Sequence, residues 1–125
     1  MNSITLKPEL NELHTLTEFI LNELPEENLQ VNLIIEEIFV NIVNYSKTEF
    51  ITVNVEYANP TLTIEFIDNG IEFNPLLEKN YTLPADIDEA KVGGLGILLT
   101  KEMSDNLDYH YENEKNHLKI IKKVN

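Results

Sequence analysis

Three short polar signatures interrupt an otherwise apolar chain of 125 residues. In the first, Glu37 and Asn41 lie four residues apart, so that on a helix they share one face. A carboxylate there can act as a general base, and a neutral amide oxygen suits Mg²⁺. The structural alternative is that Glu37 is solvated beside Glu36 at the helix border, while Asn41 caps a neighbouring loop.

The second signature, Asp68-Asn69-Gly70, ends a stretch of alternating apolar and polar residues. A carboxylate at the edge of a sheet can accept a hydrogen bond from an exocyclic amine such as adenine N6. A glycine lets a flat ring approach the backbone closely. The same three residues are also typical of a type I′ hairpin turn, although Asn74-Pro75 would break the second arm at once.

The third signature is a glycine cluster, Gly93-Gly94-Leu95-Gly96, placed directly before an apolar segment. Glycine amides and a helix N-terminus then converge, and this geometry binds anions such as phosphate. The cluster matches neither a Walker A loop nor a Rossmann fingerprint. The alternative is that the glycines form a flexible hinge.

Apolar periodicity predicts the elements that must position these residues. Strands are expected near Ile4–Leu6, at 51–57 and 62–66 around a turn at 58–60, and at 107–112 and 117–124 around a turn at 113–116. Helices are expected at 8–24, 26–45 and 95–103, with an irregular stretch at 74–92. This order predicts one α+β domain over residues 1–125. We expect a two-layer sandwich with a mixed, mostly antiparallel sheet and its helices on one face.

Composition narrows the possible partners. The formal net charge is -13 and the chain contains no arginine, so we expect no direct nucleic-acid ligand. The acidity suits a basic protein partner, or it only keeps the domain soluble. No apolar run of membrane-spanning length, no signal peptide and no cysteine is present, which predicts a cytoplasmic protein without a membrane contact. The histidines, His14, His110 and His117, are scattered in sequence without zinc-site spacing, so we expect no zinc site.

On these signatures the chain resembles the Bergerat-fold (GHKL) ATPase superfamily, and within it the stand-alone bacterial anti-sigma-factor serine/threonine kinases. The resemblance runs from the first helix to the last strand. The N box is matched by Glu37 and Asn41, the first glycine box by Asp68 and Gly70, and the second by Gly94 and Gly96. The run Phe73-Asn74-Pro75 is similar to the Phe-Asp-Pro that often follows the first box in this branch.

The resemblance implies a nucleotide site under a mobile lid. It places Mg²⁺ on Asn41 and adenine on Asp68, and it makes Glu37 the catalytic base. Further ATP contacts are implied for Gly70, Phe73, Gly93, Gly94, Leu95, Gly96 and Lys101. The implied activity is phosphorylation of a serine or threonine on an antagonist (anti-anti-sigma) protein, alternating with binding of a sigma factor. A homodimer is also implied.

Several positions depart from the family pattern. Glu72 stands at the second glycine of the first box, and Tyr45 stands where a histidine is often found. By alignment, Lys119 takes the place of a threonine that supports the adenine-binding aspartate in many members. Without arginine, Lys91 and Lys101 are the lysines expected near the phosphates, as point charges. These departures leave open a second function, a non-catalytic, nucleotide-gated protein-binding module of the same fold.

Overall fold

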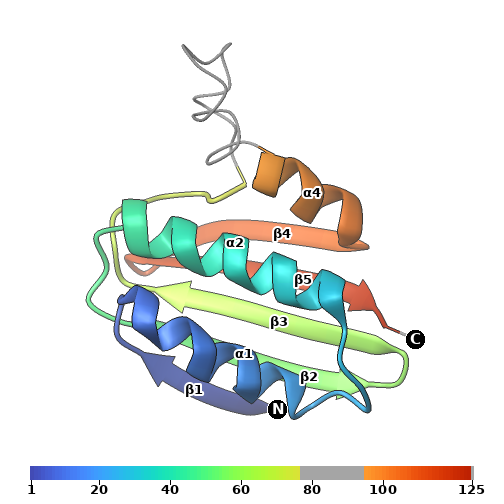
Figure 1. Cartoon of the computed structure of the whole chain (residues 1–125). Helices are drawn as coiled ribbons and strands as arrows, with labels where there is room; N and C mark the ends of the chain where they lie inside the picture. Colours follow the sequence, from blue (N-terminus) through green and yellow to red (C-terminus); the bar gives the residue numbers. More distant parts are fainter. Residues whose placement is uncertain (77–94, 125) are drawn as a thin grey trace.

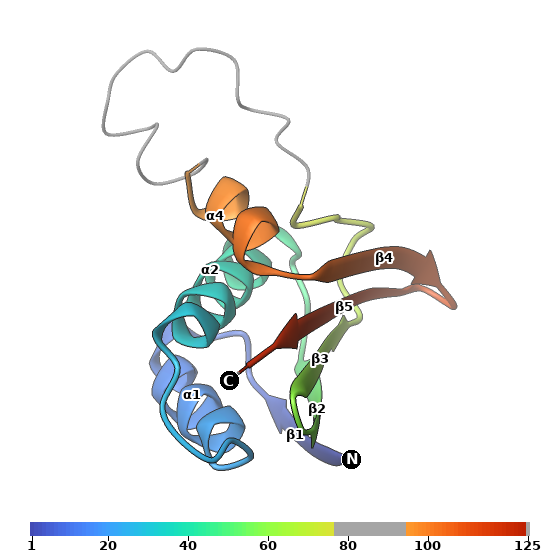
Figure 2. The same ribbon diagram turned by 90° about the vertical axis from the view of Figure 1, so that its right-hand side faces the viewer.

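The computed structural model describes residues 1–76 and 95–124. In this part of the chain five strands form one sheet in the order β1-β2-β3-β5-β4. The helices α1, α2 and α4 all cover the same face of that sheet (Figures 1 and 2). The predicted two-layer α+β class is confirmed, and every neighbouring pair among the described strands is antiparallel.

The observed bounds follow the predicted order of elements. The strands are β1 (Asn2–Leu6), β2 (Ile51–Ala58), β3 (Thr61–Asp68), β4 (Asn106–Glu112) and β5 (Lys115–Lys123). The helices are a short 3-10 helix η1 (Leu10–Glu12), α1 (Leu13–Leu21), α2 (Leu29–Tyr45) and α4 (Leu95–Met103). The predicted first helix is therefore shorter than expected and begins with a 3-10 turn. Beyond residue 76, the predicted irregular stretch lies outside the described residues.

Helix α2 begins later than predicted because Asn28 caps it. The Asn28 side-chain oxygen accepts a hydrogen bond from the backbone N–H of Val31 at 3.0 Å, with an extended backbone at Asn28 itself. This contact satisfies one of the amide donors that a helix leaves unpaired at its start. The acids Glu26 and Glu27 consequently precede the helix instead of forming its first turn.

The turn between β4 and β5 is tighter than the predicted one. Glu112 pairs with Lys115, which leaves only Asn113 and Glu114 in the turn, with φ of 55° and 62°. Positive φ at both central positions is the signature of a type I′ hairpin. Strand β5 therefore starts two residues before the predicted His117, and Asn116 belongs to the strand.

One hydrophobic core lies between the sheet and the helices. Alternate residues of the central strands point into it, including Val53, Phe66 and Leu118, and α2 buries Phe39 against them. Helix α2 buries seven of its residues in this way, as expected of a helix that is apolar on most sides. None of the described helices is both long and apolar enough to cross a membrane.

The N-cap of α2 gives a testable contribution to stability. Asn28→Ala should lower the free energy of unfolding by about 1 kcal/mol, because the Val31 amide loses its acceptor. Asn44→Ala is the matched control, since Asn44 lies exposed near the other end of the same helix. Urea denaturation of both variants measures the difference, and an equal effect of the two would contradict the capping role.

Candidate functional site

Asp68 is a buried carboxylate at the end of strand β3. It pairs with Ile51 of β2 on one side and with Asn116 of β5 on the other, and only 2% of its surface is exposed. The pleat directs it toward the helices, in line with the core residues Phe66 and Ile64. A buried carboxylate is costly unless hydrogen bonds compensate it.

Three hydrogen bonds converge on one oxygen of this carboxylate. Oδ1 accepts from the Ser46 hydroxyl at 2.6 Å, from the Gly70 amide at 2.9 Å and from Asn116 Nδ2 at 2.9 Å. Within the described parts of the chain, Oδ2 receives no hydrogen bond. The described residues thus saturate one oxygen of the carboxylate and leave the other without a hydrogen-bond partner.

Gly70 is required by a close approach within the protein. A Cβ at this position would lie 2.1 Å from both the carbonyl oxygen and the hydroxyl of Ser46. The Ile71 amide donates to the same carbonyl at 2.8 Å, which holds the loop against the end of α2. No strand follows Gly70 in residues 71–76, so the hairpin alternative for Asp68-Asn69-Gly70 is wrong.

Asn69 joins the loop to the connection between α2 and β2. Its side-chain oxygen accepts from the Thr48 hydroxyl at 2.7 Å and from the Glu49 amide at 3.0 Å. Its own amide group donates to the Glu49 carboxylate at 2.9 Å. Asn69 therefore has a structural role, which leaves Asp68 as the residue of this signature that faces the helix layer.

Glu37 and Asn41 share one face of α2, as predicted. Asn41 is buried, and its Nδ2 donates to Glu37 Oε2 at 3.0 Å, so it does not cap a neighbouring loop. Glu37 is half-buried, and burial raises its pKa above the ordinary 4.5, while the bond from Asn41 lowers that pKa and the charge of Glu36 raises it. A raised pKa makes a carboxylate a stronger base.

Only part of the glycine cluster can be placed. Gly93 and Gly94 lie outside the described residues, whereas Leu95 and Gly96 begin α4, where the sequence predicted the helix to start. Lys101 lies in the last turn of α4, away from its N-terminal end. The phosphate cradle therefore stays a prediction.

The far end of α4 is anchored to the sheet. Lys122 is buried on β5 and donates from Nζ to the carbonyl of Met103 at 2.6 Å. A cation at this position complements the negative end of the helix dipole. The helix also packs against α2, and its residues Ile97 and Thr100 are buried.

The Asp68 cluster consists of Asp68 and its hydrogen-bond donors Ser46, Gly70 and Asn116. Two of these donors, Ser46 and Asn116, were not predicted as site residues from the sequence. The first, Ser46, directly follows α2, and its N–H closes the last helical turn on Ile42. The second, Asn116, is on the same face of β5 as Leu118 and Ile120. That two-residue spacing was the available signal, but it was hidden because Asn116 was assigned to a turn.

The placement of Lys119 beside the aspartate is wrong. Lys119 pairs with Glu65 and Asp108 and is exposed on the face of the sheet away from the helices. The residue that supports Asp68 is Asn116, three positions earlier. The supporting interaction is therefore present in this chain, made by an amide.

Phe73 and Tyr45 lie beside the Asp68 cluster. Their ring centroids are 5.9 Å apart with planes inclined by 44°, a common geometry for aromatic pairs. Tyr45 is half exposed, and the Phe73 amide donates to Asn116 Oδ1 at 2.8 Å. Glu72, the departure at the second glycine of the first box, is exposed.

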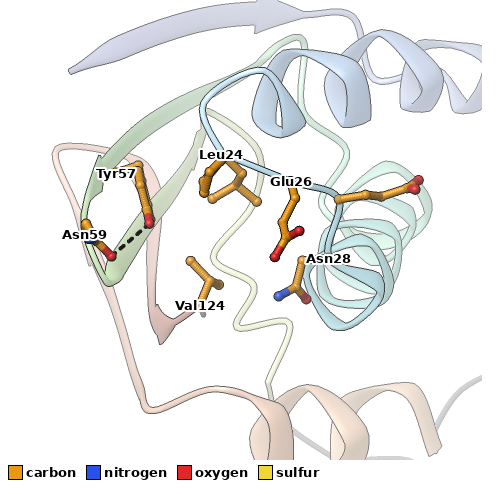
Figure 3. Close-up of a pocket in the computed structure, with 8 residues that line it drawn as sticks. Leu24, Glu26, Asn28, Tyr57, Asn59 and Val124 are labelled. Atoms are coloured by element: carbon orange, nitrogen blue, oxygen red, sulfur yellow. Dashed lines mark hydrogen bonds between the residues drawn. The ribbon is translucent and has the colours of Figure 1, made fainter.

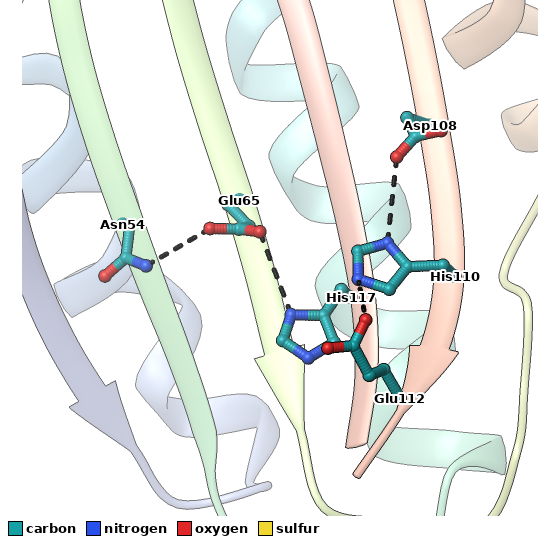
Figure 4. A network of polar contacts seen from close by, with 6 residues as sticks. All are labelled: Asn54, Glu65, Asp108, His110, Glu112 and His117. Carbon is teal, nitrogen blue, oxygen red and sulfur yellow. Dashed lines mark hydrogen bonds and ion pairs between the residues drawn. The ribbon is translucent and has the colours of Figure 1, made fainter. Parts of the chain in front are cut away.

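Two of the histidines are in contact on the face of the sheet away from the helices (Figure 4). His110 and His117 are cross-strand neighbours whose rings stack with centroids 4.6 Å apart and planes 3° apart. Ring nitrogens lie 3.7 to 3.8 Å from the carboxylates of Asp108, Glu112 and Glu65. No group of three or more potential ligands is arranged to hold a metal ion in the described residues.

A pocket of about 350 Å³ lies at the opposite end of the sheet, between the α1–α2 connection and the β2–β3 turn (Figure 3). Its lining residues are Leu24, Pro25, Glu26, Glu27, Asn28, Tyr57, Asn59 and Val124. None of them belongs to the three signatures. Two glutamates and no basic residue line this pocket, so it is unsuited to phosphate.

Comparison with known proteins agrees with this arrangement. A model of the histidine kinase-like ATPase domain family matches residues 9–122, nearly the whole chain. The chain belongs to this family. The predicted membership of the Bergerat-fold ATPase superfamily is thereby confirmed, and it supports an ATP-binding, kinase-type domain. The anti-sigma-factor kinase branch stays a prediction.

The fold of this histidine kinase-like ATPase domain is also similar to that of a solved structure. The Acinetobacter baumannii histidine kinase AdeS matches with a TM-score of 0.56 over 100% of this chain and 68% of that chain. The two sequences are 13% identical, so the likeness concerns the fold alone. A search of curated proteins finds no match.

The close approach at Gly70 predicts a large effect of a single methyl group. Gly70→Ala should destabilise the fold by at least about 1–3 kcal/mol, because the new Cβ overlaps Ser46. Adding Ser46→Ala should not restore stability, since the carbonyl oxygen of residue 46 stays in place. Chemical denaturation of Gly70→Ala, Ser46→Ala and the double variant tests this, and full recovery in the double variant would contradict it.

The raised pKa of Glu37 predicts a pH-dependent stability. Below pH 4.5 the group is protonated in both states, and ionisation costs stability as the pH rises through the folded-state pKa. Glu37→Gln, which stays neutral, should therefore have a higher Tm than wild type at pH 7–8 but not below about pH 4.5. Glu56→Gln controls for the loss of one negative charge. A Tm difference independent of pH would argue against burial of the charge.

Proposed function

We propose that this protein binds ATP with Mg²⁺ and acts as an anti-sigma-factor-type serine/threonine protein kinase. In this proposal it phosphorylates an antagonist (anti-anti-sigma) protein and regulates a sigma factor by binding it. The observation that carries the proposal is the Asp68 carboxylate, with one saturated oxygen and one available oxygen. An acceptor held in this way suits the N6 amine of adenine.

The side chains at α2 fit a Mg²⁺-bound triphosphate. Asn41 uses its Nδ2 for Glu37, so its carbonyl oxygen is left for a hard cation that prefers oxygen ligands. Asn41 would hold Mg²⁺, which supplies charge neutralisation at the phosphates when bound. The same hydrogen bond orients the Glu37 carboxylate toward Asn41, one helical turn away.

Glu37 is the proposed general base. Its Oε2 accepts from Asn41, so Oε1 remains to take the proton of the acceptor hydroxyl as that oxygen forms its bond to the γ-phosphorus. The bond from that phosphorus to the β-phosphate oxygen breaks in the same step. The raised pKa supports this role, because a stronger base accepts the proton more readily at neutral pH.

Nucleotide binding is tested by thermal stability. Millimolar ATP with Mg²⁺ should raise the Tm of the wild type, by the equivalent of about 2.7 kcal/mol when the ligand is at a hundred times its Kd. Asp68→Asn should lose most of this shift, whereas Asp108→Asn, an exposed carboxylate on the open face, should keep it. Absence of any shift in the wild type would overturn the proposed function.

Phosphoryl transfer needs a separate assay with labelled ATP and candidate antagonist proteins. Glu37→Ala should keep the ATP-induced Tm shift but lose label transfer, and Glu36→Ala, the exposed neighbour, should retain both. If the wild type binds ATP and a partner without transferring label, the protein is instead a nucleotide-gated binding module. The absence of arginine is the feature that favours this second function.

A further inference from the structure

Asn116 is a buried amide at the centre of the polar cluster. It lies on β5 directly opposite Asp68 in the sheet register, and 3% of its surface is exposed. Its neighbours on the same face of the strand are apolar core residues. A buried amide in such a place is costly unless its hydrogen bonds are made.

All four hydrogen-bonding positions of the Asn116 side chain are used. Nδ2 donates to Asp68 Oδ1 at 2.9 Å and to the Ile71 carbonyl at 2.7 Å. Oδ1 accepts from the Phe73 amide at 2.8 Å and from the Tyr109 hydroxyl at 2.5 Å. Rotating the amide by half a turn would set its oxygen against a carboxylate and a carbonyl, so only one orientation is allowed.

We propose that Asn116, beyond supporting Asp68, is a positioning residue that couples the adenine-accepting carboxylate to the backbone of residues 71–73 through one side chain. This rests on the proposed function of Asp68. Because the two protons of one amide reach Asp68 and Ile71, the carboxylate and the loop cannot move independently. Phe73, which packs on Tyr45, is held by the other side of the same amide.

The arrangement has two consequences for a nucleotide. The carboxylate and the aromatic pair are ordered before the ligand arrives, which reduces the cost of binding. Because Asn116 bonds both groups, a ligand bound to Asp68 also affects the hydrogen bond of the Phe73 amide. By linkage, loss of the Phe73 hydrogen bond weakens binding of that ligand.

No other side chain of similar size can make this set of contacts. Threonine has a single hydroxyl proton, which suffices for Asp68 but leaves the Ile71 carbonyl without a donor, and its shorter side chain does not bring an acceptor to the Phe73 amide. Aspartate has no donor when ionised, and it would place a second carboxylate against Asp68. Two such groups share a proton, and their titrations become coupled.

The test uses the full chain with Asn116→Thr and Asn116→Asp, and with Asn106→Thr and Asn106→Asp as controls on exposed β4. Amide hydrogen exchange is measured at Phe73 and at the core residue Val53, and ATP affinity is measured by calorimetry between pH 7 and 9. In Asn116→Thr, exchange at Phe73 should rise at least about tenfold relative to Val53, and ATP affinity should fall about threefold to tenfold.

The aspartate variant adds a signature that general loss of stability would not produce. Its ATP affinity should fall at least about tenfold as the pH rises and the shared proton leaves, whereas wild type and the Asn106 variants should change by less than about threefold. If Asn116→Asp does not fold, Asn116→Thr still tests the proposal through the Phe73 amide.

The outcomes separate this inference from the proposed function. If wild type binds ATP and Asn116→Thr alters neither affinity nor exchange at Phe73, the positioning role is overturned and the proposed function stands. If wild type binds no ATP, the role toward a nucleotide is overturned together with the proposed function, whatever Phe73 shows. Local loss of protection at Phe73 together with weaker ATP binding supports the inference.

Discussion

The buried carboxylate of Asp68 is the constraint on which one end of this molecule depends. Left unpaired, it would cost several kcal/mol or take up a proton. Three donors from three segments meet at its Oδ1. Each donor is held independently: Ser46 by the end of α2, Gly70 by the absence of a side chain, and Asn116 by the register of the sheet. The charge therefore ties together the ends of α2, β3 and β5.

The hydrogen bond between Ser46 and Asp68 connects the proposed base with the proposed adenine acceptor. Helix α2 carries the proposed base Glu37, and the same helix ends at Ser46, which bonds the adenine-accepting carboxylate. The base and the acceptor thus belong to one packed unit, with Asn41 orienting the base from one helical turn away. A rigid scaffold of this kind allows reacting groups to be aligned without a large ordering cost at the time of binding.

The rest of the described surface has a different chemistry. The far pocket is lined by carboxylates and apolar side chains, and the open face of the sheet carries a stacked histidine pair among acids. Neither place combines a buried acceptor with a helix-borne base. With a net charge of -13, the chain would repel a polyphosphate over much of its surface, so binding must come from local contacts that outweigh this repulsion.

The amino-acid sequence alone was enough for the type and order of the elements, because apolar periodicity is local. Helix α4 was predicted to the residue, and the paired strands β2 and β3 within two residues, whereas α1 and α2 begin later and β5 begins earlier than predicted. It also identified Glu37, Asn41 and Asp68 as polar exceptions. It could not place Asn116, because a two-residue turn with positive φ sets the register of β5, and a shift by one residue moves every side chain to the other face. Which polar groups meet at Asp68 is decided by contacts between segments far apart in the chain, and such contacts form only when the sheet and the helix layer pack together.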